Sequence, residues 1–397
     1  MSEKNTTMIP AIVLGSHTMG LAIIRSLGQV GVPVIVVCYG REDMGYRSKY
    51  VKECLFTESP ESSEDAFLDV LLHCNQKYGK CVVFPSDDAS LWVVAKNKAY
   101  LSAYHFLACP DWELVNLVVD KKRTYALAAQ NDIPSPRTMV PEDESEVESF
   151  CELIGYPCLI KPCLSHRYYD HFKKKMTRVE NLQQALAAYR EAAAFEVEVM
   201  VQELIPGGDT LGVNYNSFVF GDDLPVEFVA EKVRLSPPGF GVPRVVKSKW
   251  IPEVAEAGQK TVRSFGYQGY SCTEFKRDPR DGTYKLMELN GRHNRSSLLS
   301  LKCGINFPFI EYQSHVEGVC LKQVQSDTEY MWIDEFRDLY QTFVSAKEES
   351  LGVRRIIEPY VNKHVFAVFD RRDLAPFAAR VQGLLKQMVS QEVQDES

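Results

Sequence analysis

Three oxygen-bearing side chains on two neighbouring segments, Glu274, Glu288 and Asn290, have the types and spacing of a site for a hard cation. Residues 272–277 and 283–289 are interpreted as the strands of a hairpin, because the Asp-Pro and Asp-Gly pairs between them favour a reversal of the chain. Side chains two residues apart share one face of a strand, so two carboxylates and one amide oxygen can converge. Such donors suit Mg²⁺, which takes few protein ligands and leaves positions open for substrate phosphates.

Two arginines, Arg292 and Arg295, follow the second strand directly. Arginine is expected where the oxygens of a phosphate group must be held. The alternative is that Glu274 and Glu288 are solvated charges on an ordinary surface hairpin, since exposed glutamate is common. The apolar residues on both sides of Glu288 in LMEL indicate a largely buried strand, which favours the metal site.

The segments TEFK and KLMELNGR resemble the metal-binding hairpin of the ATP-grasp superfamily, in which an acidic residue on one strand precedes Glu-x-Asn-x-Arg on the next. The resemblance implies that Glu274 and Glu288 bind one Mg²⁺ and that Glu288 and Asn290 bind a second, with Mn²⁺ as an alternative metal. It also implies that Arg292 faces the phosphoryl group transferred from ATP.

Two lysines upstream belong to the same resemblance. A helix is predicted from about Asn116 and ends at NDIPSP, where the prolines force an extended exit. Lys161 ends the apolar strand PCLI, so its charge needs a partner unless the side chain reaches the surface. In the superfamily, a DK pair at a helix start and a P-apolar-apolar-KP strand supply the lysines that hold the ATP phosphates, which implies Lys121 and Lys161 here.

The segment VMVQELIPGGDT is predicted to be a strand that runs into a glycine turn, and it resembles the hinge of ATP-grasp enzymes. The resemblance implies that main-chain groups of Glu203 and Ile205 meet the adenine edge and that Asp209 meets the ribose hydroxyls. Gln202 is predicted to be a further nucleotide-binding residue.

Antiparallel strands are predicted between this hinge and the hairpin, and Lys232 and Arg234 alternate onto one strand face. In the superfamily, basic residues here reach the γ-phosphate or an acyl-phosphate, and others hold a substrate carboxylate. A single lysine on a strand more often faces solvent, so the prediction applies to Lys232 and Arg234 as a pair.

One segment departs from the family pattern. Many members have a glycine-rich loop over the phosphates, whereas residues 163–178 read CLSHRYYDHFKKKMTR. Glycine allows backbone N–H groups to approach anions closely, so side chains would have to close over ATP here. Ser165, His166, Arg167 and the lysines of residues 173–175 are the candidates, and a solvated basic loop is an equal alternative.

The N-terminal part alternates strand and helix, with strands at residues 11–15 and 33–39 around a helix at residues 19–31. This alternation predicts a parallel sheet, whose ligands bind beyond the carboxyl ends of the strands. The turn GSHTMG lacks the glycines of a dinucleotide motif and is interpreted as a tight turn. Candidate substrate contacts at these strand ends are Ser16, His17, Ser86, Asp87 and Asp88.

The predicted fold class is therefore α/β, an ATP-grasp fold preceded by a Rossmann-like βαβ domain and followed by an α+β extension. The predicted domains are a pre-ATP-grasp domain at 1–112, an ATP-grasp domain at 113–325 and a C-terminal extension at 326–397. Within the ATP-grasp domain, the small lobe covers about 123–200 and the metal lobe about 201–325.

Composition narrows the possible partners. The 397 residues carry a formal net charge of -8, which disfavours nucleic acid and anionic membranes as partners and favours small molecules. The eleven cysteines have no regular spacing, which predicts reduced thiols and a cytoplasmic protein. The apolar run MIPAIVLG is too short for a membrane span and is interpreted as a first buried strand.

Within the superfamily the chain is most similar to carboxylate-amine ligases related to D-aspartate ligase, partly through PVIVV and RSKYV in the first domain. The resemblance implies an amide-forming enzyme that uses ATP, a small-molecule carboxylate and an amine, and passes through an acyl-phosphate. Dimers are common among the relatives, so a homodimer is a candidate assembly. Two alternatives stay open: an enzyme that phosphorylates a hydroxyl or enol before amine attack, and a non-catalytic nucleotide-binding regulatory protein.

Overall fold

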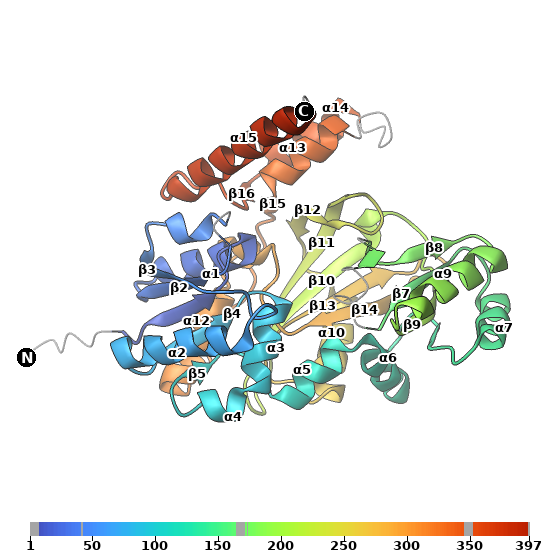
Figure 1. Cartoon of the computed structure of the whole chain (residues 1–397), viewed down its shortest axis with the longest axis horizontal. Helices are drawn as coiled ribbons and strands as arrows, with labels where there is room; N and C mark the ends of the chain where they lie inside the picture. The colour runs from blue at the N-terminus through green and yellow to red at the C-terminus, as the bar shows by residue number, and fades with distance from the viewer. Residues whose placement is uncertain (1–7, 41–42, 164–170, 173, 345–351, 396–397) are drawn as a thin grey trace, which may run out of the picture.

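Three sheets organise the chain, as the computed structural model shows for residues 8–40, 43–163, 171–172, 174–344 and 352–395. The first is a five-stranded sheet of order β3-β2-β1-β4-β5, and all its pairs are parallel (Figure 1). Its strands are β1 Ala11–Leu14, β2 Val34–Cys38, β3 Val51–Phe56, β4 Val82–Pro85 and β5 Phe106–Leu107, and its helices are α1 Thr18–Gly28, α2 Glu64–Tyr78, α3 Asp88–Lys96 and α4 Lys98–Leu101.

Helices cover both faces of this parallel sheet. Alternate residues of β1, such as Ile12 and Leu14, pack with Phe67 of α2 and Leu91 of α3. The residues between them pack on the opposite face with α1, for example Val13 with Ile23 and Ile24. Near-continuous apolar strands are what a sheet buried on both faces requires, and AIVL and VIVVC are of this kind.

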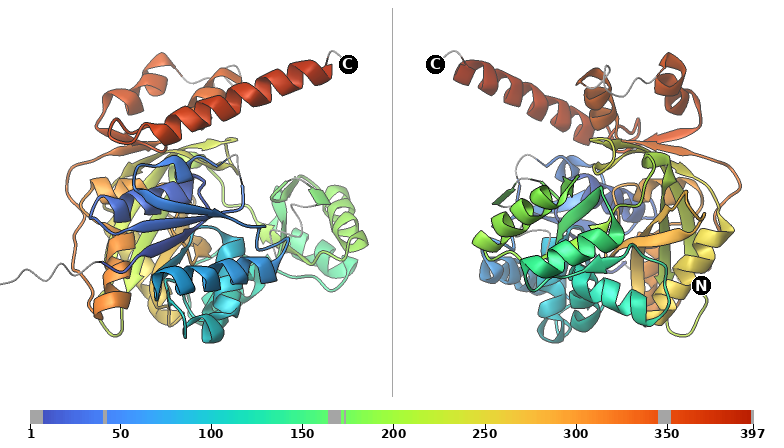
Figure 2. Two further views of the ribbon diagram at one scale, coloured as in Figure 1. Left: turned by 60° about the vertical axis from the view of Figure 1, so that its left-hand side comes forward. Right: turned by 90° about the vertical axis from the view of Figure 1, so that its right-hand side faces the viewer.

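The second sheet has four strands in the order β6-β9-β7-β8 and forms the small lobe, which stands out to one side of the molecule (Figure 2). Its strands are β6 Thr138–Met139, β7 Cys158–Pro162, β8 Thr177–Val179 and β9 Val199–Glu203. Helices α7 (Glu144–Ile154) and α9 (Leu182–Ala194) cover one face with a shared apolar cluster.

Two helices, not one, lead into this lobe. The predicted single helix near Asn116 is wrong, because Asp120 adopts an extended conformation between α5 (Trp112–Val119) and α6 (Lys121–Gln130). The Asp120 carboxylate caps α6 by accepting the N–H of Lys122 at 3.0 Å. Aspartate is a favoured N-cap, so a new helix begins at Lys121.

The third sheet has seven strands in the order β14-β13-β10-β11-β12-β15-β16. The large lobe supplies β10 Gly212–Val219, β11 Val226–Ser236, β12 Val242–Ser248, β13 Gly269–Arg277 and β14 Tyr284–Asn290. Helix α10 (Pro252–Ser264) packs on one face of this sheet, and α11 (Ser297–Lys302) and α12 (Phe307–Glu317) lie between the other face and the first domain.

The C-terminal extension continues the third sheet through β15 (Met331–Ile333), which pairs with β12, and β16 (His364–Phe366), which pairs with β15. Its helices are α13 Glu335–Val344, α14 Val353–Val361 and α15 Ala375–Asp395, which lie across the top of the molecule in Figure 1. The extension also contacts the first domain, where Arg25 of α1 pairs with Asp373 at 3.0 Å.

Two further features are the state of the cysteines and the hydropathy of the helices. All eleven cysteines are free thiols. Among the described residues, no helix combines the length and the apolar character that crossing a membrane would need.

Glu335, the first residue of α13, has a buried carboxylate that accepts the N–H groups of Phe369 at 2.7 Å and Ala367 at 3.1 Å. Burial raises the pKa of this carboxyl from 4.5 to about 7, although these hydrogen bonds oppose the shift. The folded state therefore binds the proton more tightly than the unfolded state. The resulting stabilisation is complete below pH 4.5 and is lost as pH rises through about 7.

We expect Glu335→Gln to remove about 1–3 kcal/mol of the decrease in unfolding free energy between roughly pH 5 and pH 8. Urea denaturation of both proteins across this range measures the effect. Parallel pH profiles for the variant and the wild type would contradict it.

Candidate active site

The predicted hairpin is confirmed as the antiparallel pair β13 and β14, and it brings the three candidate metal ligands together. Glu274 lies directly opposite Glu288, and Cys272 lies opposite Asn290. Directly opposed residues have their Cβ atoms about 4.5–5.5 Å apart, so the two carboxylates are neighbours on one face. The donor set of two carboxylates and an amide fits Mg²⁺ by chemistry.

Each carboxylate of this pair forms a salt bridge with a lysine from another element. Lys121, the first residue of α6, donates to Glu288 Oε1 at 2.8 Å, and Lys232 of β11 pairs with Glu274. Burial alone would raise the pKa of Glu288, but Lys121 and Lys161 outweigh it and hold that pKa at about 2. The site is therefore a compact set of alternating charges, and its lysines keep the Glu288 carboxylate ionised.

Lys161 of β7 is buried and does not extend to the surface. Its Nζ lies 3.3 Å from the Tyr125 hydroxyl and 3.4 Å from Gln202 Oε1. Gln202 is fully buried, and its amide donates to Thr138 Oγ1 at 2.9 Å. Gln202 thus orients Lys161 from the adjacent strand β9.

The hinge residues are engaged with neighbouring segments. The N–H of Glu203 donates to the carbonyl of Arg137 at 2.9 Å, and the Glu203 carboxylate pairs with Arg280 at 2.6 Å. The carbonyl of Ile205 accepts a hydrogen bond from Lys276 at 2.8 Å. The predicted adenine contacts of Glu203 and Ile205 stay predictions.

Asp209, the predicted ribose contact, ties the hinge to the turn between β11 and β12. Its carboxylate accepts the N–H of Leu235 at 3.0 Å and the N–H of Gly239 at 2.8 Å. The ribose contact stays a prediction. The Asp209 carboxylate would have to accept hydrogen bonds from the ribose hydroxyls as well as from the N–H groups of Leu235 and Gly239.

Lys232 and Arg234 contact different acidic residues in this structure. A β-bulge shifts the register of β11 against β12 between these residues. Lys232 contacts Glu274, whereas Arg234 contacts Asp338 of α13 at 3.1 Å. Alternation predicted that the two side chains share one strand face, and the bulge lies between them. The catalytic roles of Lys232 and Arg234 stay predictions.

Arg292 connects the large lobe to the first domain. Its guanidinium holds Asp88 of α3 through two hydrogen bonds, of 2.7 Å and 2.9 Å. Arg295 lies apart from this contact and pairs with Asp334 at 2.6 Å. Asp88 was a candidate substrate contact, and the structure places it against the arginine predicted to face the transferred phosphoryl group.

The remaining first-domain candidates gather at the carboxyl ends of β1 and β4. His17 Nε2 lies 3.2 Å from Asp87 Oδ2, and Tyr39 donates its hydroxyl hydrogen to the same oxygen. Burial alone would raise the pKa of Asp87, but His17 and Tyr39 lower it to about 2. Ser86 donates to the carbonyl of Leu14. Of the first-domain candidates, Asp88 is the one that contacts Arg292.

The predicted basic loop is described only in part. Ser165, His166, Arg167 and Lys173 lie outside the described residues. The pKa of Lys175 is lowered by desolvation, while Glu288 and Glu274 oppose that shift. Lys175 therefore lies within electrostatic reach of the carboxylate pair.

Lys276 and the Glu203–Arg280 contact were not predicted as parts of the site. Lys276 donates to the carbonyls of Ile205 and Gly207 at 2.8 Å and 2.9 Å, so it fixes the hinge. Its position two residues after Glu274 puts it on the same strand face, which is a signal that the sequence contained. No comparable spacing links Arg280 to Glu203, because a turn residue and a distant strand meet there.

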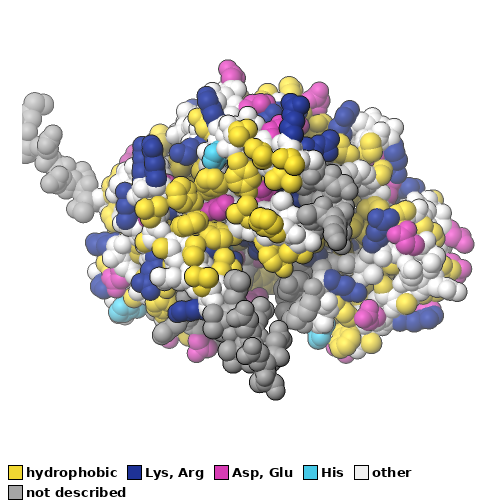
Figure 3. Space-filling model, turned by 90° about the horizontal axis from the view of Figure 1, so that it is seen from above, with side chains coloured by type: hydrophobic (Ala, Val, Ile, Leu, Met, Phe, Trp, Pro, Cys, Tyr) yellow, Lys and Arg dark blue, Asp and Glu magenta, His cyan; other side chains and the backbone are white. Residues whose placement is uncertain are grey.

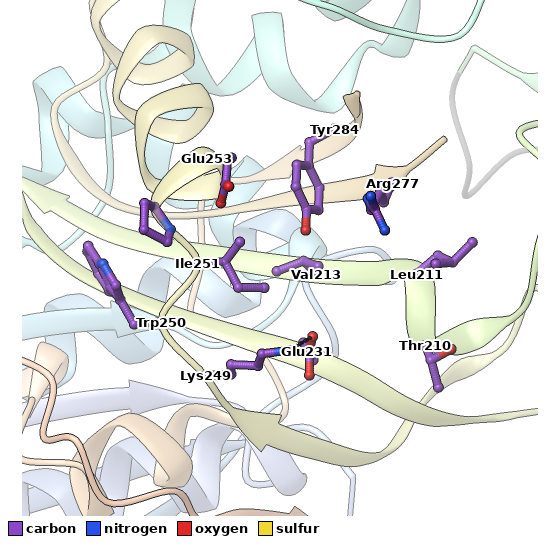
Figure 4. A pocket seen from close by; sticks show the side chains of 11 residues that line it. Thr210, Leu211, Val213, Glu231, Lys249, Trp250, Ile251, Glu253, Arg277 and Tyr284 are labelled. Carbon is purple, nitrogen blue, oxygen red and sulfur yellow. Dashed lines mark hydrogen bonds and ion pairs between the residues drawn. The ribbon is translucent and has the colours of Figure 1, made fainter. Parts of the chain in front are cut away.

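A separate hollow of about 320 Å³ lies on the other face of the third sheet (Figure 4). Glu231 precedes Lys232 on β11 and therefore points away from the carboxylate pair, toward Lys249, with which it pairs at 2.6 Å. Val213 and Ile251 form part of the lining. This hollow is not continuous with the candidate site, since the sheet separates them.

Comparison with known proteins shows one similarity that extends over almost the whole chain. D-aspartate ligase of Enterococcus faecium (strain Aus0004) is 24% identical, and the alignment covers 94% of this chain and 92% of that protein. No protein-family model matches.

Solved structures show the same fold at low sequence identity. L-amino acid ligase from Bacillus licheniformis superposes with a TM-score of 0.65 at 16% identity, over 82% of this chain and 80% of that chain. A biotin carboxylase domain dimer of Hydrogenobacter thermophilus 2-oxoglutarate carboxylase, in complex with MgADP, has a TM-score of 0.63 at 15% identity, over 82% and 74%. The predicted ATP-grasp fold and the resemblance to the D-aspartate ligase group are confirmed.

Proposed function

We propose that this chain, an ATP-dependent carboxylate-amine ligase of the ATP-grasp fold, joins substrates that carry amino-acid groups. The observation that carries the proposal is the charge cluster in which Lys121 and Lys232 flank Glu288 and Glu274. The names of the similar proteins, D-aspartate ligase and L-amino acid ligase, support amino acids as the substrate class.

In this proposal Lys121 and Lys161 hold the ATP phosphates, and Glu274, Glu288 and Asn290 hold Mg²⁺. The proposal includes two Mg²⁺ ions, with Mn²⁺ as an alternative. Bound Mg²⁺ would neutralise the negative charge of the phosphates. Lys232 would face the γ-phosphate side of the site, and Arg292 would exchange part of its contact with Asp88 for phosphate oxygens.

The reaction needs no covalent intermediate on the protein. A substrate carboxylate oxygen bonds to the γ-phosphorus, and the bond from that phosphorus to the bridging oxygen of ADP breaks. The amine nitrogen of the second substrate then bonds to the acyl carbon, phosphate leaves, and the amine proton passes to solvent. Lys121 and Lys161, already fixed in position, would lower the activation barrier of phosphoryl transfer by neutralising the charge that develops on the phosphates.

Two further parts of the proposal concern location and assembly. Eleven free thiols support a reducing compartment, for which we propose the cytoplasm. We also propose a homodimer, and the dimeric biotin carboxylase domain with the same fold supports this.

The test is to incubate the protein with ATP, Mg²⁺ and pools of carboxylates and amines, and to measure ADP and phosphate release together. Substrate-stimulated release of both, abolished in Glu288→Ala and retained in Glu231→Ala on the other face of the sheet, is the expected result. ADP release with phosphate retained on the product would indicate a phosphotransferase instead. Absence of ATP binding would overturn the proposal.

A further inference from the structure

Helix α13 of the C-terminal extension is oriented with polar residues inward and apolar residues outward. Its buried residues are Glu335, Asp338 and Gln341. Leu339, Tyr340, Phe343 and Val344 are exposed. A surface helix of a globular protein normally buries its apolar stripe, so this orientation requires an explanation.

Specific polar contacts fix α13 in this orientation. Asp338 lies between Arg234 at 3.1 Å and Arg244 at 3.5 Å, both from the third sheet. Gln341 accepts a hydrogen bond from Ser236 at 2.9 Å. Rotating the helix to bury its apolar side would leave these buried charges without their partners, which is strongly unfavourable.

The neighbouring helix α14 extends the same surface. Val353, Ile357 and Val361 are spaced four residues apart, lie on one side of the helix and are exposed. Tyr360 ties α14 to α13 by donating to Asp338 at 2.8 Å. Figure 3 looks down on the extension and shows hydrophobic side chains gathered across it.

The exposed area is large for a protein without a partner. Seven residues, Leu339, Tyr340, Phe343, Val344, Val353, Ile357 and Val361, which we call the extension face, are each between 48% and 80% exposed. For side chains of these sizes, the exposed areas of the seven residues sum to roughly 800 Å². One partner in a standard protein interface contributes about the same area.

We propose that the extension face binds the same face of a second copy of this chain. The proposal specifies the interface of the homodimer proposed above but does not depend on ligase activity. A two-fold axis makes one patch self-complementary, as most homodimers require. Arg354 and Glu358 lie four residues apart beside the aliphatic stripe of α14, and an antiparallel second copy presents them in the reverse order. Unlike charges can therefore face each other along the contact.

The experiment is sedimentation velocity on the full chain at about 1, 10 and 100 µM. We expect a dimer for the wild type and at least a 100-fold rise in the dimer dissociation constant for Phe343→Ser combined with Val361→Ser. The matched control is Leu224→Ser, an exposed apolar residue that is 69% exposed outside the extension. Unchanged melting temperatures would show that the variants are folded.

Three results would overturn the proposal. One is a wild type that stays monomeric at about 100 µM. Another is a double variant that dimerises as tightly as the wild type. The third is a monomeric wild type that sediments with phosphatidylglycerol–phosphatidylcholine vesicles while the double variant does not, because the face would then bind lipid.

Discussion

Replacing Glu288 by glutamine is expected to lower kcat for ADP release by about 10³-fold, with a smaller effect on stability. Glu288 Oε1 accepts a hydrogen bond from Lys121 Nζ at 2.8 Å. The positive charges of Lys121 and Lys161 keep the pKa of Glu288 at about 2. The substitution keeps the shape of the side chain but removes the charge that organises both lysines. The loss should appear in the chemical step, because the charge balance around the phosphates is what the site supplies.

The measurement is coupled ADP release under saturating ATP, together with ATP binding by calorimetry. Glu231→Gln is the matched control, since Glu231 lies on the same sheet, faces the opposite side and pairs with Lys249. Because Glu288 is 35% exposed in its side chain, the loss of its ion pair should cost at most about 1 kcal/mol in stability. A variant with wild-type kcat would show that Glu288 has no part in catalysis.

The pH dependence of Glu288 follows from the direction of its shift. A pKa of about 2 means that the carboxylate stays ionised throughout the range in which the enzyme can be assayed. Any acidic limb of the activity profile near neutral pH must therefore arise from another group.

The local chemistry of the site could be predicted from the sequence, since it follows from strand periodicity. Glu274, Glu288 and Asn290 come together because their alternation survives in the folded hairpin. Lys121 was predicted only from the resemblance of its DK pair, because the helix start that Asp120 caps was missed in the sequence.

Long-range partners could not be predicted in the same way. Asp88 meets Arg292 across two domains, and nothing in the spacing of either residue specifies the other. Arg234 was predicted to share a strand face with Lys232, and neither the bulge in β11 nor its contact with Asp338 was predicted. Bulges depend on the partner strand, so a single segment does not reveal them.

Long-range contacts also determine how the helices of the C-terminal extension are oriented, and these contacts could not be predicted from the sequence. An α+β extension was predicted, but not which side of each helix would face inward. The inward side of α13 is polar because Asp338 forms ion pairs with Arg234 and Arg244 of the third sheet. Hydrophobic periodicity alone would have placed Phe343 inside.

Removal of the Asp373 carboxylate should destabilise the protein by about 3–5 kcal/mol in Asp373→Ala, the largest stability effect we expect. Asp373 and Arg25 are each about 1% exposed in their side chains and lie 3.0 Å apart. Asp373 also accepts the Ser48 hydroxyl at 2.7 Å and the N–H of Lys49 at 2.9 Å. The variant would leave the Arg25 charge buried without its carboxylate.

The double variant Arg25→Met with Asp373→Leu separates the cost of an uncompensated charge from the value of the pair itself. Apolar replacements of similar volume often restore much of the stability that a single deletion removes, so the double variant should unfold at higher urea than Asp373→Ala. Asp370→Ala, in the same loop but less buried, is the control and should change stability by less than about 0.5 kcal/mol. If Asp373→Ala and Asp370→Ala unfold alike, the pair does not lock the extension to the first domain. If only the single deletion is severe, the buried pair of Arg25 and Asp373 holds the C-terminal extension to the first domain.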